Sequence, residues 1–297
     1  MDQPLISVLM PVYNGEQFLA ESVESLLNQT YKNFELIIIN DASTDNSEGI
    51  VKTLQQKDSR IKLINNKFEK GISGGLNSGL EIAQGEYIAR ADSDDINKSL
   101  RFEEQIEFLK SHPEVSILGG GYAPFNSERR LEIFHPSNSI ELAWKFISNT
   151  YFCHPTVMFR KKVYDEIGGY INAKAEDFTY FSKILKKYKG SNLHKILIDY
   201  REHETNYSNT FKEPVLENVK KISEENFIYY NGSTNGYSQF IRFQTTKKLS
   251  PRDLFYLISI NNRIIEKIRN DYKDSVLNLN YLFFRFNILF KLVIGIF

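Results

Sequence analysis

The chain of 297 residues has little cysteine, no net charge and no apolar run long enough to cross a membrane. Its single cysteine, Cys153, excludes a disulfide within the chain and provides no thiolate cluster for a structural metal, so the reducing cytoplasm is the expected location. The first residues carry no basic segment, and the apolar run that follows ends at Pro11. We therefore expect no secretory signal at this end.

The apolar C-terminal stretch, residues 281–297, is interrupted by Arg285, Asn287 and Lys291. It falls short of the ~20 residues that span a bilayer. A helical wheel leaves it a broad apolar face, which is typical of a helix lying in the membrane interface. Contact with the inner face of the cytoplasmic membrane is one expectation, and packing on the domain or on a second copy is the alternative.

The charges balance at 37 Lys and Arg against 37 Asp and Glu, but they are distributed unevenly. Residues from Arg242 onward hold ten basic and four acidic side chains, so this part is +6 and residues 1–241 are −6. A neutral total gives no reason to expect a nucleic-acid partner. With 41% hydrophobic and 25% charged residues, the composition is globular, and the length predicts either one large domain or a domain with an appendage.

The first hundred residues alternate short apolar runs with stretches of helical spacing, the pattern of strands and helices around a parallel sheet. The expected strands are 5–10, 34–39, 60–64 and 87–89, and the expected helices are 14–29, 45–54 and 77–83. Right-handed crossovers between such strands place ligands beyond their carboxyl ends. Polar or glycine-rich segments occur at these ends, namely residues 14–16, 40–43, 71–75 and 92–95.

The pattern after residue 100 is less regular. We expect a helix over 100–110, a weakly patterned region from Gly119 to Pro155, a strand over 153–160 and a helix over 177–188. A polar segment, 201–209, then ends the αβ part, and helices follow. The predicted division is residues 1–210 and a helical region 211–297.

The acidic cluster Asp92, Asp94 and Asp95 follows an apolar strand. Three neighbouring carboxylates are costly to bury unless a cation neutralises them, and Mg²⁺ or Mn²⁺ shared with a diphosphate would do so through oxygen ligands. The alternative is a solvated turn that caps the next segment. This cluster alone does not decide between the two.

Three motifs in order carry a family resemblance: Pro11-Val12-Tyr13-Asn14, the segment 40–45, and Asp92-x-Asp94-Asp95. Together they resemble the family-2 bacterial glycosyltransferases of the GT-A fold, from about residue 5 to residue 210. Further matches are Gly71-Ile72-Ser73, Leu76-Asn77-Ser78-Gly79, Gly85-Glu86-Tyr87-Ile88, the segment 154–160, Gly168-Gly169-Tyr170, Glu176-Asp177 and Tyr200-Arg201-x-His203.

The resemblance implies an α/β fold with a Rossmann-like, mixed and mainly parallel sheet, flanked by helices, and a C-terminal helical appendage. It implies an inverting, metal-dependent transfer of a sugar from a nucleotide-diphosphate donor, in particular a UDP-sugar. The acceptor would be a hydroxyl of a glycan or a lipid-linked glycan in surface polysaccharide synthesis.

The resemblance also assigns residues to the donor and the metal. Those assigned to the donor are Pro11, Tyr13, Glu16, Asp41, Asn77, Asp92, Asp95 and Glu176, with Asp41 accepting a hydrogen bond from uracil. Asp94, Asp92 and His203 are assigned to Mn²⁺ or Mg²⁺, which stabilises the leaving diphosphate. Leu76 stands where many relatives have arginine, so one diphosphate or donor contact is either missing or made instead by Lys70 or Arg90.

Asp177 is the general base in this resemblance, since a carboxylate at a helix start can take the proton of the attacking hydroxyl. The alternative is that Glu176 and Asp177 only cap their helix. The upstream motifs favour catalysis. His154 is expected to be structural or to lie on the acceptor side.

Two other functions compete with this one. A sugar nucleotidyltransferase would share the α/β sheet and the acidic metal ligands, but residues 11–16 contain no lysine or arginine to bind a triphosphate. A catalytically silent nucleotide-sugar-binding scaffold would have no reason to keep both Asp94 and Asp177.

Overall fold

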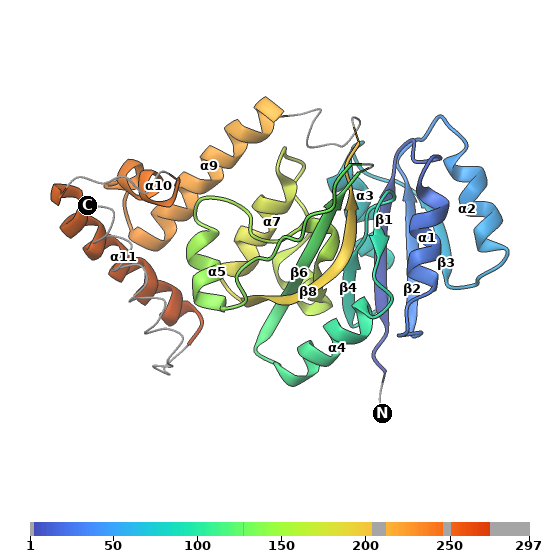
Figure 1. Ribbon diagram of the computed structural model, residues 1–297, viewed down its shortest axis with the longest axis horizontal. Coiled ribbons are helices and arrows are strands. Elements are labelled where there is room, and N and C mark those ends of the chain that lie inside the picture. Colours follow the sequence, from blue (N-terminus) through green and yellow to red (C-terminus); the bar gives the residue numbers. More distant parts are fainter. Residues whose placement is uncertain (1–2, 127, 204–211, 246–250, 274–297) are drawn as a thin grey trace.

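A computed structural model describes residues 3–126, 128–203, 212–245 and 251–273. An eight-stranded sheet forms its centre, in the order β3-β2-β1-β4-β7-β6-β8-β5 (Figure 1). The pairs β2-β3, β1-β2, β1-β4 and β6-β8 are parallel, and the other three are antiparallel. The expectation of a mixed, mainly parallel α/β fold is confirmed.

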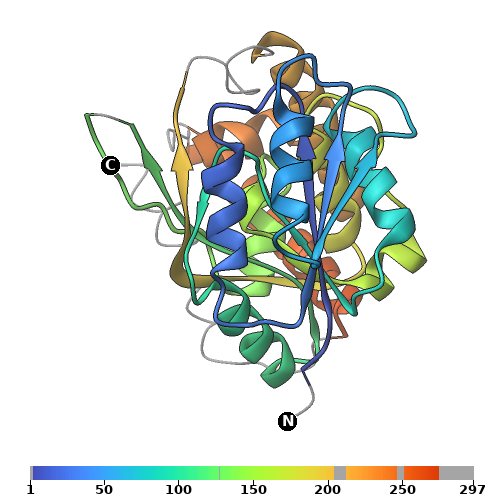
Figure 2. The same cartoon turned by 90° about the vertical axis from the view of Figure 1, so that its right-hand side faces the viewer.

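The parallel half is built from β1 (Ile6–Val12), β2 (Phe34–Asn40), β3 (Ile61–Asn65) and β4 (Tyr87–Arg90). Every residue of β2 and β4 is buried, as expected of strands covered on both faces. The strands β1, β2 and β3 end at the same edge of the sheet (Figure 2). All four sequence-predicted strands of this half are confirmed within two residues.

The rest of the sheet differs from the expectation. Residues from Gly119 onward lie in the long strand β6 (Val115–Phe125), and β8 (Lys189–Arg201), which was not predicted, pairs with it. Sequence analysis missed β6 because glycine is rare in strands and this strand contains three consecutive glycines, residues 119–121. They are required here: an added Cβ at Gly119 would lie 2.7 Å from Phe152 Cδ1, and one at Gly120 would lie 2.6 Å from Leu197 Cγ.

The predicted strand 153–160 is also shorter than expected. Its first part forms a 3₁₀ turn, His154–Thr156, and only β7 (Met158–Arg160) joins the sheet. The two-residue strand β5 (Ile96–Asn97) completes the edge beside β8.

Helices cover both faces of the sheet. The helices α1 (Leu19–Leu27), α2 (Ser47–Gln55) and α4 (Arg101–Ser111) share one hydrophobic cluster with the strands. The opposite face packs against α3 (Ile72–Ile82), α5 (Ser139–Lys145), α6 (Lys161–Ile167) and α7 (Glu176–Leu185). The helix predicted over 14–29 begins only at Leu19, whereas that predicted over 77–83 begins earlier, at Ile72.

A third hydrophobic cluster joins α5 to the helices α9 (Lys212–Asn231), α10 (Tyr237–Thr245) and α11 (Pro251–Asp271) (Figure 1). Within it, Trp144 Nε1 donates to Asn261 Oδ1 at 2.8 Å. The predicted C-terminal helical region is therefore present and packs on the αβ part. The division at residue 210 stays a prediction, because residues 204–211 lie outside the described ranges.

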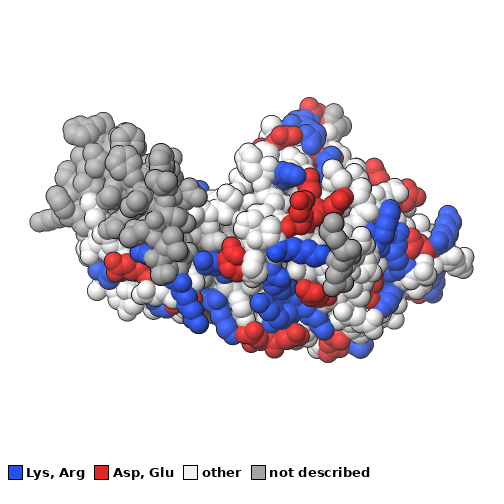
Figure 3. Space-filling view, turned by 90° about the horizontal axis from the view of Figure 1, so that it is seen from below, with Lys and Arg blue, Asp and Glu red and all other residues white. Residues whose placement is uncertain are grey.

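Among the described residues, no helix combines the length and the apolar character that crossing a bilayer requires. The predicted interfacial segment 281–297 lies outside these residues. On the face shown in Figure 3, basic and acidic side chains are interspersed. The ion pairs Lys195–Glu104, at 2.7 Å, and Lys98–Asp199, at 2.5 Å, are examples of such mixed charge on the surface.

Candidate functional site

The loops that follow the first two strands and precede α7 carry strained backbone. Asn14, Ala42 and Ala175 adopt φ of 50°, 59° and 61°, and they are three of the four non-glycine residues with positive φ in the described chain. A side chain in this conformation costs on the order of 1 kcal/mol. Such strain often occurs at binding and catalytic sites, and here it lies in three of the loops that the sequence motifs single out.

The first two loops hold each other through hydrogen bonds. Asn14 Oδ1 accepts from Thr44 N at 2.8 Å, and Glu16 Oε2 accepts from Asn46 N at 2.9 Å. Ser47 Oγ accepts from Gly15 N at 2.9 Å. Glu16 is exposed, and its carboxylate contacts the backbone at the start of α2. Its expected contact with the nucleoside stays a prediction.

Beside these loops is a cavity of about 520 Å³, called here the donor cavity. Tyr13, Asp41 and Lys70 line it, with the Lys70 ammonium 3.8 Å from the centre of the Tyr13 ring. Asp41 is buried and accepts from Asn66 Nδ2 at 2.6 Å and from Gly71 N at 2.8 Å. The two hydrogen bonds fix the Asp41 carboxylate at the cavity wall.

Pro11 and Asn77 are placed differently from these residues. Pro11 lies on β1 and packs close to Gly75 of α3, where an added Cβ would be 3.2 Å from Pro11 Cβ. Asn77 donates to Tyr170 O at 2.9 Å and accepts from Tyr170 N at 2.8 Å. Its amide thus ties α3 to the loop before α7, and the expected donor contacts of both residues stay predictions.

The acidic cluster is compact. Asp92, Asp94 and Asp95 each direct one carboxylate oxygen to within 4.8 Å of the others. Asp94 Oδ2 lies 2.9 Å from His203 Nε2, and Asp95 Oδ1 accepts from Arg201 N at 2.9 Å. The sequence-predicted metal residues Asp92, Asp94 and His203 are therefore brought together.

The cluster fits a divalent cation. Asp95 is 1% exposed, and its Oδ2 has no hydrogen-bond partner in the described part of the chain. Burial raises the pKa of Asp95 well above its ordinary value, and repulsion from Asp92 and Asp94 raises it further. A cation with oxygen ligands would satisfy the unpaired oxygen and offset this repulsion.

Two buried arginines stand behind the acidic cluster. Arg90 is 4% exposed and forms an ion pair with Asp92, while Arg101 of α4 is fully buried and donates to Arg90 O at 2.8 Å. Burial and repulsion from Arg90 lower the pKa of Arg101 to about 9. Sequence reasoning missed Arg101, because an arginine in the first turn of an amphipathic helix resembles any surface charge.

Across from the cluster, α7 presents two carboxylates at its first turn. Phe178 N donates to Asp177 Oδ1 at 2.7 Å, while His154 Nδ1 lies 3.7 Å from Glu176 Oε1 and His154 Nε2 lies 3.2 Å from Tyr170 Oη. Burial, followed by repulsion from Asp177, raises the pKa of Glu176 to about 7. Burial also raises the pKa of Asp177.

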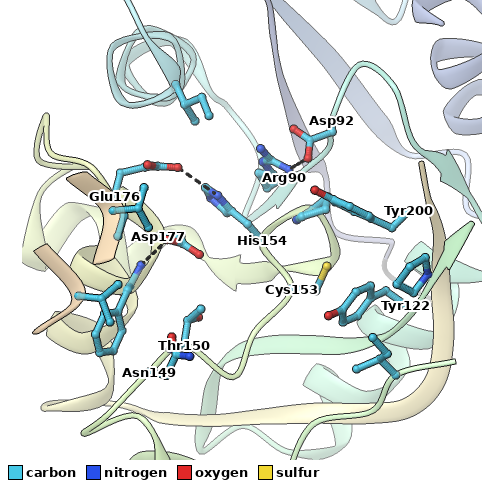
Figure 4. A pocket seen from close by; sticks show the side chains of 18 of the residues that line it. Arg90, Asp92, Tyr122, Asn149, Thr150, Cys153, His154, Glu176, Asp177 and Tyr200 are labelled. Atoms are coloured by element: carbon cyan, nitrogen blue, oxygen red, sulfur yellow. Dashed lines mark hydrogen bonds and ion pairs between the residues drawn. The ribbon is translucent and has the colours of Figure 1, made fainter. Parts of the chain in front are cut away.

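The acidic cluster and α7 line one cavity of about 550 Å³, called here the central cavity. Figure 4 shows Arg90 with Asp92 on one side of it and Glu176 with Asp177 on the other. Ile72 and Glu176 line both this cavity and the donor cavity, so the two adjoin. The wall also holds Tyr122, Cys153, His154 and Tyr200, and sequence reasoning singled out only His154 as lying near the acceptor.

The chain belongs to glycosyl transferase family 2, whose family model matches residues 7–168. An uncharacterised glycosyltransferase of Haemophilus influenzae is 33% identical over 241 residues, which are 76% of this chain and 74% of that protein. The Escherichia coli UDP-Glc:alpha-D-GlcNAc-diphosphoundecaprenol beta-1,3-glucosyltransferase WfgD is 41% identical over 127 residues, 43% of this chain and 49% of that protein. The family predicted from the motifs is confirmed.

Two solved structures share the fold. Staphylococcus aureus TarS, residues 1–349 in complex with UDP-GlcNAc, has a TM-score of 0.63 and 19% identity, covering 98% of this chain and 81% of that one. The mannosyltransferase PcManGT of Pyrobaculum calidifontis, in complex with GDP-Man and Mn²⁺, has a TM-score of 0.57 and 13% identity. The match covers 100% of this chain and 88% of that one. These likenesses confirm the GT-A type of fold.

Proposed function

We propose that this glycosyltransferase moves a sugar from a UDP-sugar to a hydroxyl of a glycan or lipid-linked acceptor, with inversion at the anomeric carbon. The observation that carries the proposal is the central cavity, which Asp92 and Asp94 line on one side and Asp177 on the other. Inversion by direct displacement needs a leaving-group stabiliser and a base on opposite sides of the reacting carbon. The carboxylates on the first side could hold a cation that stabilises the leaving group, and Asp177 on the other side could act as the base.

The donor cavity supports uridine as the base. Each oxygen of the Asp41 carboxylate accepts one protein hydrogen bond, and a carboxylate oxygen has a second lone-pair site for a donor such as the uracil N–H. The Tyr13 ring offers a flat surface at the same cavity, with Lys70 beside it. The structural neighbour TarS binds UDP-GlcNAc, and the relative WfgD is a UDP-Glc-dependent glucosyltransferase, which supports the same donor class here.

Asp92, Asp94 and Asp95, with His203 beside them, would hold Mn²⁺ or Mg²⁺, which supplies a Lewis acid for the departing diphosphate. The Mn²⁺ of PcManGT belongs to that protein and supports the same class of ion here. Arg90, paired with Asp92 at the cavity wall, adds fixed positive charge near the same position. No protein acid is then required.

Asp177 takes the proton of the attacking hydroxyl. Its raised pKa makes it a stronger base than an exposed aspartate, and the hydrogen bond from Phe178 N fixes the carboxylate at the helix start. Glu176, with a pKa of about 7, is partly protonated at neutral pH and can donate a hydrogen bond at the junction of the two cavities. The two adjacent carboxylates thus have different roles.

The direct test is incubation of the protein with a panel of UDP-sugars and Mn²⁺. We expect slow release of UDP in the absence of acceptor, faster release with an acceptor hydroxyl, and loss of Mn²⁺-dependent UDP binding in Asp94→Ala. Asp165→Asn, an exposed carboxylate on α6, is the matched control. Pyrophosphate release from a nucleoside triphosphate would instead support a nucleotidyltransferase, and the absence of both reactions would support a binding scaffold.

A further inference from the structure

A third cavity adjoins the central cavity and shares no lining residue with the donor cavity among the residues that the structure describes. It measures about 240 Å³ and shares Asn149 and Val219 with the central cavity. We call it the side cavity. It lies between the loop after α5 and the helices α9 and α10, and its lining includes Ser148, Lys220, Ser223, Tyr237 and Gln244.

The three cavities therefore form a series. The donor cavity meets the central cavity at Ile72 and Glu176, and the central cavity meets the side cavity at Asn149 and Val219. A sugar transferred at Asp177 comes from the donor end, so the acceptor has to enter from another direction. The side cavity provides such a direction.

The chemistry of the side cavity differs from that of the central cavity. Among the described residues, its lining contains no carboxylate, and hydroxyl, amide and aromatic groups make up most of it. The Tyr237 hydroxyl lies 3.0 Å from Ser223 Oγ, and Gln244 Oε1 accepts a hydrogen bond from Ser148 Oγ. Hydroxyl and amide groups can exchange hydrogen bonds with the hydroxyls of a sugar in either direction, and apolar side chains can pack on its C–H faces.

Two donors in the side cavity remain available to a ligand. Lys220 is exposed, and no side-chain partner of its ammonium occurs in the described part of the chain. Asn149 uses only its carbonyl oxygen, which accepts from Thr150 N at 2.8 Å. The side cavity is smaller than the roughly 300–1,000 Å³ of cavities that take drug-sized ligands, which fits a single ring.

We propose that the side cavity is a second acceptor subsite, which binds the sugar residue next to the one that reacts. This inference rests on the proposed function and narrows it, since the acceptor then is a glycan of at least two residues. The reacting sugar occupies the central cavity near Asp177, and its neighbour contacts Lys220 and Gln244.

The test compares acceptor probes of different length on the full chain with UDP and Mg²⁺ bound. Cellobiose and N,N′-diacetylchitobiose are compared with methyl β-glucoside, methyl β-N-acetylglucosaminide and octyl β-glucoside by saturation-transfer NMR. We expect the better disaccharide to bind at least tenfold more tightly than its monosaccharide. Lys220→Ala and Gln244→Ala should reduce this gain to threefold or less.

Lys221→Ala is the matched control, because Lys221 is the exposed neighbour on α9 outside the side-cavity lining. It should keep the full gain, and UDP binding should be equal in all variants. A disaccharide gain that survives in both test variants, or that is absent in the wild type, would overturn the subsite. The octyl chain could also give octyl β-glucoside the same gain in affinity over methyl β-glucoside, with that gain lost in the same variants. This result would overturn the sugar subsite and assign the side cavity to an apolar group.

This outcome can be separated from failure of the proposed function. Failure of that function appears as no release of UDP from any UDP-sugar by the wild type, whatever the acceptor length. Failure of the subsite appears as turnover with equal binding of mono- and disaccharides.

Discussion

At the scale of single residues, neighbouring carboxylates have different surroundings. Asp177 and Glu176 are adjacent in the chain, yet Glu176 lines both the donor and the central cavity while Asp177 lines the central cavity alone. Burial is the largest cause of the raised pKa of each. The two residues therefore give two separate predictions.

Asp177→Asn should remove the base and leave the cavity shape intact. We expect transfer to fall roughly 10²–10⁴-fold, the range for loss of a general base, while UDP affinity measured by calorimetry with Mn²⁺ changes less than twofold. Asp165→Asn should leave both quantities at the wild-type level. Transfer by Asp177→Asn at the native rate would show that the base is another residue.

Glu176→Gln should change how stability depends on pH. The folded-state pKa of about 7 lies above the ordinary value of 4.5, so the protonated form contributes stability below pH 4.5 that is lost as pH rises through 7. The variant is neutral throughout, so its free energy of unfolding relative to wild type should rise by roughly 3 kcal/mol between pH 4 and 8. Urea unfolding at each pH measures this difference in free energy of unfolding. Glu217→Gln, which replaces an exposed glutamate, is the control.

At the scale of elements, the site depends on contacts that hold α3 and α7 in place. The Asn77 side-chain amide on α3 exchanges two hydrogen bonds with the backbone of Tyr170. It also lies close to Gly169, where an added Cβ would clash with this amide. The loop between α6 and α7 is thereby fixed against α3. The close approach of Asn77 explains the glycine at position 169, and the φ of 83° explains the one at position 168.

Asn77→Ala should leave the Tyr170 amide and carbonyl without these partners. We expect the free energy of unfolding to fall by roughly 1–3 kcal/mol, measured by urea denaturation. Asn262→Ala on α11, a residue with no side-chain hydrogen bond in the described chain, should cost less. A loss of UDP affinity at unchanged stability would instead support the donor contact that the family resemblance assigns to Asn77.

At the scale of the whole molecule, the C-terminal helices complete one wall of the site. Val215 and Val219 of α9 line the central cavity, and α9 is held to α5 through the third hydrophobic cluster. The αβ part therefore does not form the wall of the central cavity alone. Any further contact of the C-terminal region has to begin from this packed arrangement.

We propose that the segment from Tyr281 brings the enzyme to the inner face of the cytoplasmic membrane, where lipid-linked acceptors would be elongated. Removal of residues 281–297 should lower recovery with anionic liposomes in flotation at least fivefold at low salt, because apolar burial and the preceding basic residues are expected to act together. Turnover of soluble acceptors should be unchanged. Equal recovery of both chains would contradict membrane binding.

The sequence alone determined the family, the parallel half of the sheet and the carboxylates of the site. These are local patterns: buried strands such as Phe34–Asn40 are continuous apolar runs, and Asp92 to Asp95 follow one directly. The tertiary structure decided which of these strands and side chains lie next to one another. It paired β6 with β8 and buried Arg101 behind the aspartates. It also placed Asp94 and Asp177, which are far apart in the chain, in the wall of one cavity. Such contacts depend on how strands pair and helices pack, and no local spacing of residues records that.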